Sequence, residues 1–303
     1  MKKRLITCLL AGAMIFSLAA CNQSGTSSAA PSTAPSQGSA SSAAADDQSE
    51  SPSTGDLSGI VKTGGSTSVE KVMNALIYKF QEDNANVTIN YEMNGSGDGI
   101  QGVIDGKYEI GHASRDLKDE EAAEGLKGTA YAIDGIAVVV NKDNSVTDLT
   151  QQQIKDIYTG KITNWSEVGG KDAPITVVTR ESGSGTRSAF GEIVGVEDEE
   201  LLATATECKD TGAVQTTVSQ NANAIGYMSF SDLDEDMVNA VNYEGVAIST
   251  DTLKDGSYKL QRSFLLVTKE DAELSDAAQA FIDFILSDEG QQLVTDNKLI
   301  PVK

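Results

Sequence analysis

The chain has 303 residues, of which 39 % are hydrophobic and 22 % charged, enough for one large or two ordinary domains with a sizeable core. Its 45 acidic side chains outnumber its 23 basic ones, which argues against a duplex nucleic acid bound through a basic face. The single histidine, His112, excludes a two-histidine zinc motif, and the absence of a Gly-Lys pair before Ser or Thr excludes a Walker A loop. Only Cys208 of the three cysteines follows the leader region, which excludes a disulfide framework.

The N-terminus is typical of an export signal. Three basic residues, Lys2 to Arg4, precede an apolar run at 5–20 that is shorter than the roughly 20 residues of a spanning helix. The run ends in Leu-Ala-Ala ahead of Cys21, which resembles a bacterial lipobox, in which the cysteine is lipid-modified and becomes the mature N-terminus. An ordinary signal cut near Ala20 is the alternative. We expect a lipoprotein signal peptide at 1–20, lipid attachment at Cys21, and a protein outside the cytoplasmic membrane but anchored to it.

Residues 21–56 form the next segment. Between 22 and 56 there is no Val, Ile, Leu or aromatic side chain, and Ser and Ala dominate. Such a composition cannot bury enough apolar surface to offset the entropy of ordering, so it predicts a disordered tether. The tether is expected either to hold the protein away from the membrane or to be a tail with no role of its own.

Short β-rich runs and amphipathic helical stretches alternate from Leu57 onward. Apolar residues three or four apart predict a helix after residue 68, Thr150 and Gln153 form a capping box for another, and a last helix is expected near 275–286. The predicted strands lie at 60–63, 87–91, 136–140 and 175–179. This alternation predicts an α/β protein with mostly parallel sheets.

Three times a predicted strand passes through a Gly/Ser/Thr loop into a helix, at 64–68, 94–99 and 182–186. Gly permits close backbone approach, hydroxyls donate hydrogen bonds, and the helix N-terminus favours negative charge. Arg180 and Arg187 flank the third loop, and in so acidic a chain they indicate an oxyanion clamp, although either could form a surface salt bridge instead. A single such loop is more often a cap or turn, whereas three together predict an anion site.

Several motifs in order resemble the phosphate-binding proteins of bacterial ABC phosphate importers. They are Gly65-Ser66-Thr67, Gly95-Ser96-Gly97-Asp98-Gly99, Ile110-Gly111-His112-Ala113-Ser114-Arg115, Tyr158-Thr159-Gly160-Lys161-Ile162-Thr163-Asn164-Trp165, Arg180-Glu181-Ser182-Gly183-Ser184-Gly185-Thr186, Ala224-Ile225-Gly226-Tyr227 and the segment 281–290. The resemblance covers the chain from Leu57 on. It implies a two-lobed periplasmic-binding-protein fold (type II) with two interlobe crossovers. It places lobe I at 57–135 plus 258–303 and lobe II at 136–257.

The resemblance also implies the phosphate ligands. Carried over by position, they fall on Ser66, Thr67, Ser68, Ser96, Ser114, Arg180, Ser184, Gly185 and Thr186. Many members of the family read Gly-Ala-Ser-Asp in the third motif, and that Asp accepts the phosphate proton. Here Arg115 stands in its place and Asp116 follows, so we expect both near the anion and a buried acceptor carboxylate at Asp116 or, alternatively, Asp98. A role of His112 near the site stays open.

The expected function is therefore capture of inorganic phosphate outside the cell and delivery to an ABC import permease, by a monomer that is not an enzyme and needs no cofactor or metal. Three alternatives stay open at this point. The site could take sulfate, molybdate or an organic phosphate. Ser184 could belong to a serine hydrolase, although the strict G-x-S-x-G pattern is absent. The chain could also be an adhesive or sensory surface lipoprotein.

Overall fold

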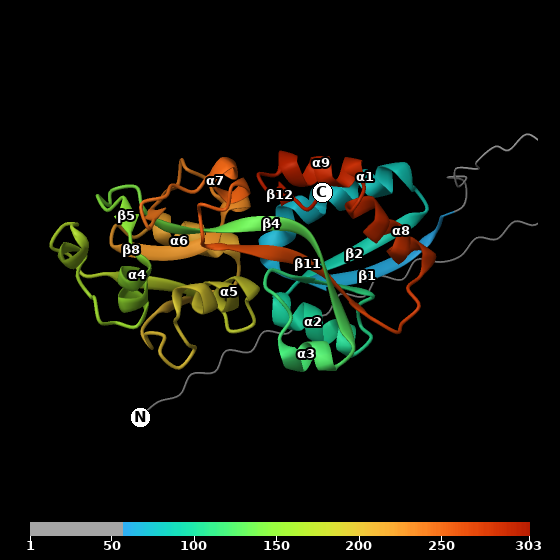
Figure 1. Cartoon of the computed structure of the whole chain (residues 1–303), viewed down its shortest axis with the longest axis horizontal. Helices are drawn as coiled ribbons and strands as arrows, with labels where there is room; N and C mark the ends of the chain where they lie inside the picture. The colour runs from blue at the N-terminus through green and yellow to red at the C-terminus, as the bar shows by residue number, and fades with distance from the viewer. Residues whose placement is uncertain (1–56) are drawn as a thin grey trace, which may run out of the picture. The chain divides into compact units, whose positions relative to one another are not determined.

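Strands and helices alternate along residues 57–303, which are the residues that the computed structural model describes (Figure 1). The predicted signal peptide, lipid-attachment residue Cys21 and tether lie outside these residues. The strands are β1 (Gly59–Gly65), β2 (Val87–Met93), β3 (Ile110–Ala113), β4 (Leu126–Asn141), β5 (Asp148–Leu149), β6 (Thr176–Arg180), β7 (Thr206–Cys208), β8 (Ala224–Ser229), β9 (Val238–Ala240), β10 (Asn242–Tyr243), β11 (Gln261–Lys269) and β12 (Ile300–Pro301). The α/β class predicted from the sequence is confirmed.

The helical segments fall between these strands. They are η1 (Thr67–Val69), α1 (Glu70–Asp83), α2 (Ser96–Ile104), α3 (Asp119–Ala123), α4 (Gln151–Tyr158), η2 (Trp165–Val168), α5 (Gly185–Val194), α6 (Thr211–Ser219), η3 (Phe230–Asp232), α7 (Thr250–Lys254), α8 (Asp276–Ile285) and α9 (Asp288–Asp296). Helices α1, α8 and α9 lie over one face of β1 and β2, and α2 and α3 lie on the other side (Figure 1). In the described part of the chain, none of these helices is both long and apolar enough to span a membrane.

The main sheet has the strand order β2-β1-β3-β11-β4-β8-β6-β7, with β9 and β12 also paired to β4. Pairing is parallel at its two ends, where β1 joins β2 and β3 and where β6 joins β7 and β8. In the centre the long strands β4 and β11 pair antiparallel with each other (Figure 1). The predicted parallel pairing is thus found within each end, and antiparallel pairs join the ends.

Two large hydrophobic clusters, one on each side of this centre, form most of the core of the described residues, and a smaller third cluster lies around Ile100, Tyr108 and Leu265. One of the two large clusters, the terminal cluster, is built from residues of 61–110, from Tyr131 and Ala132, and from residues of 264–299. The other, the middle cluster, is built from residues between Ile136 and Leu260. Strand β4 gives Tyr131 to the first cluster and Ile136 to the second. The chain passes between the clusters twice, within β4 and again at the start of β11.

Local signals set most helix ends. The predicted capping box is present, because Thr150 Oγ1 accepts the N–H of Gln153 and the Gln153 side chain accepts the N–H of Thr150. Helix α8 begins after the cap residue Ser275, as predicted. The expectation that this helix is the last one is wrong, because α9 follows directly with Ser287 as its N-cap.

Candidate functional site

The first of the three Gly/Ser/Thr loops follows β1 and leads into η1. Ser66 caps η1, and its Oγ accepts the N–H of Ser68 at 3.2 Å. Gly65 has a φ of 141°, and a Cβ there would lie 2.1 Å from the carbonyl oxygen of His112, so only glycine lets the ends of β1 and β3 come this close. Ser66 Oγ then donates to Ser114 Oγ at 2.9 Å. The turns after β1 and β3 therefore present their hydroxyls to one another.

The second loop adds Ser96, the first residue of α2. Its Oγ accepts the backbone N–H of Ser114 at 3.1 Å and lies 3.3 Å from Ser114 Oγ. Both serines are fully buried. The terminal-cluster side of the site is thus a connected row of buried hydroxyls.

The third loop brings the middle-cluster side against this row. Ser184 caps α5, with its Oγ accepting a first-turn N–H at 3.3 Å. Thr186 Oγ1 lies 2.7 Å from Ser68 Oγ, although the two residues are 118 positions apart. A Cβ at Gly185 would lie 2.2 Å from Ser96 Oγ, so only the bare backbone of glycine fits at this contact.

A backbone hydrogen bond also joins the second and third loops. The N–H of Gly97 donates to the carbonyl oxygen of Gly183 at 3.0 Å. These two residues belong to different sides of the site and to no common strand or helix. The structure therefore brings together all three loops that the sequence singled out.

Arg180 is the buried cation among these hydroxyls, with its side chain 1 % exposed. Its Nη2 donates to Thr67 Oγ1 at 2.9 Å, and its Nε and Nη2 each donate to the Glu181 carboxylate at 3.0 Å. Burial raises the pKa of Glu181, and the guanidinium of Arg180 opposes that rise. Because the carboxylate holds one edge of the guanidinium, the Nη1 end is left turned toward the hydroxyl of Thr211, at 3.5 Å.

Thr211 is a residue that the sequence reasoning missed. It is the first residue of α6, and its Oγ1 lies 3.3 Å from Ser68 Oγ. The available signal was the N-cap Asp210 after a short strand, which repeats the strand-to-helix pattern of the other loops without their Gly/Ser repetition.

We call the eight buried hydroxyls of the site the hydroxyl cluster: Ser66, Thr67, Ser68, Ser96, Ser114, Ser184, Thr186 and Thr211. The N-termini of α2, α5 and α6 and of the η1–α1 segment all begin at its members. Their first-turn N–H groups and positive dipole ends favour an anion. Together with the guanidinium of Arg180, this arrangement suits a small oxyanion with several acceptor oxygens.

The structure does not bring Arg115, Asp116 or Asp98 into this cluster. The Nη1 and Nη2 atoms of Arg115 donate to the Glu121 carboxylate, each at 2.7 Å, and Nη1 also donates to the carbonyl oxygen of Asp116. The side chains of Asp116 and Asp98 are exposed. The prediction of a buried acceptor at Asp116 or Asp98 is therefore corrected, because the turn after β3 pairs Arg115 with Glu121 and leaves Asp116 in solvent.

His112, the only histidine of the chain, packs beneath the site. Its Nε2 bonds to Thr63 Oγ1, and burial lowers its pKa to about 3. It therefore stays neutral at physiological pH. Ser184 Oγ is used as a helix cap, so the described residues provide no serine–histidine pair for the hydrolase alternative.

Arg187, the second arginine beside the third loop, forms surface ion pairs. Its Nη2 lies 2.7 Å from Asp198 Oδ1, and its Nη1 donates to the carbonyl oxygen of Arg180. It braces the strand end that carries Arg180 and has no contact with the hydroxyl cluster beyond the cap of α5.

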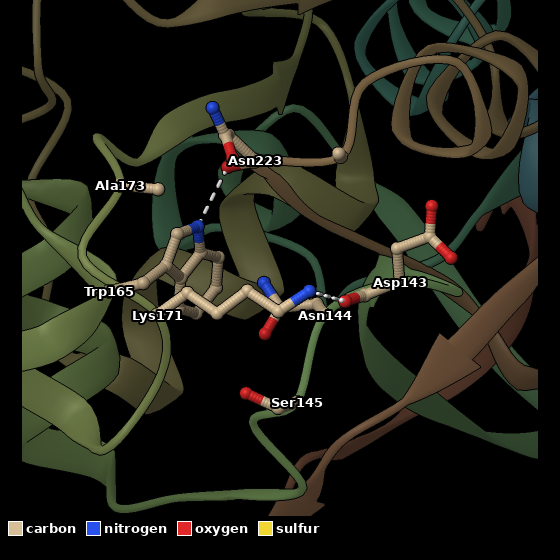
Figure 2. A pocket seen from close by; sticks show the side chains of 8 residues that line it. Asp143, Asn144, Ser145, Trp165, Lys171, Ala173 and Asn223 are labelled. Atoms are coloured by element: carbon tan, nitrogen blue, oxygen red, sulfur yellow. Dashed lines mark hydrogen bonds between the residues drawn. The ribbon is translucent and has the colours of Figure 1, made fainter.

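A separate small pocket, of about 60 Å³, lies in the middle-cluster region and is shown in Figure 2. The indole N–H of Trp165 donates to the carbonyl oxygen of Asn223 at 3.0 Å, and Lys171 Nζ donates to the carbonyl oxygen of Asp143 at 3.2 Å (Figure 2). Its volume suits a few water molecules. None of its lining residues belongs to the hydroxyl cluster, and it is not part of the candidate site.

Comparison with known sequences supports the same interpretation. The family model of the PBP superfamily domain matches residues 29–289. The curated phosphate-binding protein PstS of Bacillus subtilis is 34 % identical over 250 residues, which is 81 % of each chain. The phosphate-binding protein PstS of Borreliella burgdorferi is 29 % identical over 253 residues, covering 80 % of this chain and 90 % of that one.

Solved structures agree with the fold. A phosphate ABC transporter substrate-binding protein from Clostridium perfringens, solved with bound phosphate, is 50 % identical with a TM-score of 0.79 and covers 81 % of this chain and 100 % of its own. An ABC-type phosphate transport receptor from Vibrio cholerae is 33 % identical with a TM-score of 0.69, covering 79 % and 99 %. The predicted periplasmic-binding-protein fold is thus confirmed. By sequence, by fold and by the convergence of its three loops, the chain belongs to the PstS family of phosphate-binding proteins within the PBP superfamily.

Proposed function

We propose that this protein binds inorganic phosphate outside the cytoplasmic membrane and delivers it to the permease of an ABC importer. The observation that carries the proposal is the hydroxyl cluster, in which hydroxyls from both sides of the site meet beside the guanidinium of Arg180, and Thr67 and Thr211 contact that guanidinium. The phosphate bound in the Clostridium perfringens structure, at 50 % identity, supports the same ligand. The protein is a transport receptor and not an enzyme.

The proposed ligands are the hydroxyl cluster, Arg180 and the backbone N–H of Gly185. In the structure the hydroxyls bond to one another, and each can rotate to donate to a phosphate oxygen instead. A hydroxyl can also accept, so a protonated phosphate oxygen finds a partner without a carboxylate in the cluster. Arg115 then has a structural role, holding the turn after β3 through Glu121.

We further propose that residues 57–135 with 258–303 form one lobe and residues 136–257 the other, and that phosphate draws the lobes together. The support is that Ser68 and Thr186 meet only if the two sides are in contact. A ligand that touches both sides favours the closed arrangement by its differential affinity. Small-angle scattering should show a smaller radius of gyration at saturating phosphate, and an unchanged profile would argue for a rigid site.

The remaining proposals concern attachment and assembly. The protein is proposed to be a monomer whose Cys21 carries the lipid that anchors it to the membrane, a role that the export signal and the lipobox resemblance support. Incorporation of a labelled fatty acid should be lost in Cys21→Ala. Labelling that persists in the variant would place the lipid elsewhere, and sedimentation of the unlipidated chain would report the oligomeric state.

Calorimetry tests the main proposal directly. The chain beginning at Asn22, which carries no lipid, is titrated with phosphate, arsenate and sulfate. We expect tight binding of phosphate, binding of its structural analogue arsenate, and weaker binding of sulfate, which has no proton to give to a hydroxyl acceptor. A preference for sulfate would favour the alternative of another oxyanion, and binding of none of the three would contradict the proposal.

A further inference from the structure

A second cavity adjoins the hydroxyl cluster, and its walls come from both sides of the site. Its volume is about 380 Å³. It is lined by Thr67, Glu70, Lys71 and Asn74 on one wall and by Thr211, Gly212 and Asp232 on the other. Thr67 and Thr211 also contact Arg180, so this cavity directly adjoins the proposed phosphate ligands.

Asp232 is the residue in this cavity whose placement calls for an explanation. It ends η3, and its Oδ2 is buried without a hydrogen-bond partner among residues 57–303. An ionised carboxylate oxygen that is removed from water without a partner is destabilised. Nothing in the proposed phosphate contacts uses this side chain.

The charges that face Asp232 from its neighbours do not compensate it. Segment η1–α1 supplies Glu70 and Lys71, β4 supplies Asp134, and β11 supplies Arg262. Lys71 Nζ is directed to the carbonyl oxygen of residue 231, at 3.2 Å. Arg262 is paired with the fully buried Asp134, its Nη2 lying 3.1 Å from Asp134 Oδ2. The negative charges of Glu70 and Asp134 formally cancel the positive charges of the two basic side chains, Lys71 and Arg262. No positive charge is therefore left over to balance Asp232.

The outer side of Asp232 is more acidic still. A cavity of about 460 Å³ there is lined by Lys71, Asp232, Leu233, Asp234, Glu235, Asp236 and Lys298. Lys298 Nζ lies 3.5 Å from the carbonyl oxygen of Leu233, to which it donates. Burial first, and then the charge of Asp134, raise the pKa of Asp232 to about 7, against the opposing effect of Lys71.

We propose that Asp232 makes closure of the site proton-sensitive, because its half-buried side chain lies in the cavity between α1 and η3, where the two sides of the site meet. This inference rests on the proposed function, in which the two sides close on phosphate. When the sides separate, water reaches the carboxylate and its pKa returns toward the ordinary value of about 3.9. The closed form then has the higher pKa, so closure takes up a proton. Binding is therefore strongest below about pH 4, weakens as the pH rises from about 3.9 to about 7, and changes little from this cause above that range.

The test compares Asp232→Asn with the wild type and with Asp234→Asn. Asp234 is the matched control, because it lies two residues away in the same acidic stretch and is exposed. Phosphate affinity is measured by calorimetry at pH 4, 5, 6, 7 and 8 on the chain beginning at Asn22. The ratio of variant to wild-type affinity is compared at each pH, so that the titration of phosphate itself cancels. We expect Asp232→Asn to bind up to about 10³-fold tighter at pH 8, because about 7 and about 3.9 differ by about three pKa units and each unit is tenfold, and we expect the ratio to fall toward one as the pH approaches 4. Asp234→Asn should match the wild type throughout.

The inference is overturned if the ratio of Asp232→Asn affinity to wild-type affinity does not change with pH, or if this variant binds phosphate more weakly than the wild type at pH 8. In either case, phosphate binding by the wild type leaves the proposed function standing. Failure of the wild type to bind phosphate at any pH overturns both. Should Asp232→Asn not fold, Asp232→Ser provides a second neutral variant, with the same expected dependence of the ratio on pH.

Discussion

Replacement of Arg180 is the most informative perturbation of the site. Its guanidinium has five N–H groups, of which Nε and Nη2 bind the carboxylate of Glu181 and Nη2 also binds Thr67. The Nη1 group, at 3.5 Å from Thr211, is the part left to reach an anion, with Nη2 following if Thr67 turns to the ligand. In Arg180→Ala the phosphate loses one or two charge-assisted bonds. The phosphate is also repelled by the carboxylate of Glu181, which no longer has Arg180 as its partner.

A charge-assisted hydrogen bond in a buried site contributes roughly 1.5 to 3 kcal/mol, so we expect a loss of about 2 to 4 kcal/mol. At about 1.4 kcal/mol per decade this is a 30- to 1000-fold weaker affinity for phosphate. Calorimetry on Arg180→Ala, Glu181→Gln and the double variant separates the two contributions. Glu181→Gln keeps the cation and removes a negative charge, so it should bind phosphate at least as tightly as the wild type. The double variant should recover part of the affinity that Arg180→Ala loses, because it removes the repulsion between phosphate and the Glu181 carboxylate. It does not restore the N–H donors of Arg180.

Thermal unfolding of the unliganded variants is the necessary control, because a misfolded protein would also lose affinity. If Arg180→Ala folds normally and its affinity for phosphate stays within threefold of the wild type, the cation does not face the anion and the site as described is refuted.

Three further outcomes can be checked with the same protein. Gly185→Ala should weaken phosphate binding at least about tenfold, because its Cβ would lie 2.2 Å from Ser96 Oγ and hold the two sides apart. The Tm of the unliganded chain should change little, and an unchanged phosphate affinity would show that the two sides need not touch. Asp116→Asn and Asp98→Asn should leave the ratio of phosphate to sulfate affinity unchanged, since both side chains are exposed, and a collapsed ratio in either variant would restore a carboxylate acceptor. Added salt should speed phosphate association in stopped-flow experiments, because the formal net charge of −22 repels an anion at long range, and rates that fall with salt would reveal a local positive potential that dominates.

The parts of the site that could be predicted are those with local signals. A capping serine, a glycine that allows close approach and a strand that ends before a helix all depend on a few adjacent residues, and these signals single out the loops 64–68, 94–99 and 182–186. The individual ligands within the loops, such as Ser66, Ser96 and Ser184, follow from the family resemblance. Thr211 has only the weaker signal of the N-cap Asp210, without the Gly/Ser repetition of the other loops, and its contact with Ser68 spans 143 positions. Only the assembled fold shows that contact.

The direction in which a side chain points is the second feature that could not be predicted from the sequence. The resemblance predicts Asp116 in the site, because it follows the position of the family's acceptor Asp. Its exposure follows from the pairing of Arg115 with Glu121, a contact that the local sequence allows but does not require. Gly290 lies inside α9. A Cβ there would lie 2.2 Å from the carbonyl oxygen of Phe284, so the glycine allows α9 to pack against the end of α8.

The backbone hydrogen bond from Gly97 to Gly183 gives this site a built-in reporter. Its donor is a main-chain amide, so no substitution or label is needed to follow it. Each time the second and third loops separate, this amide is released to solvent and can exchange its hydrogen for deuterium, while amides inside α2 stay protected by their own helix. The exchange rate of this one position, relative to its neighbours in the same helix, therefore measures how often the empty protein opens, and the slowing of that rate by a ligand measures how firmly the ligand keeps the protein shut.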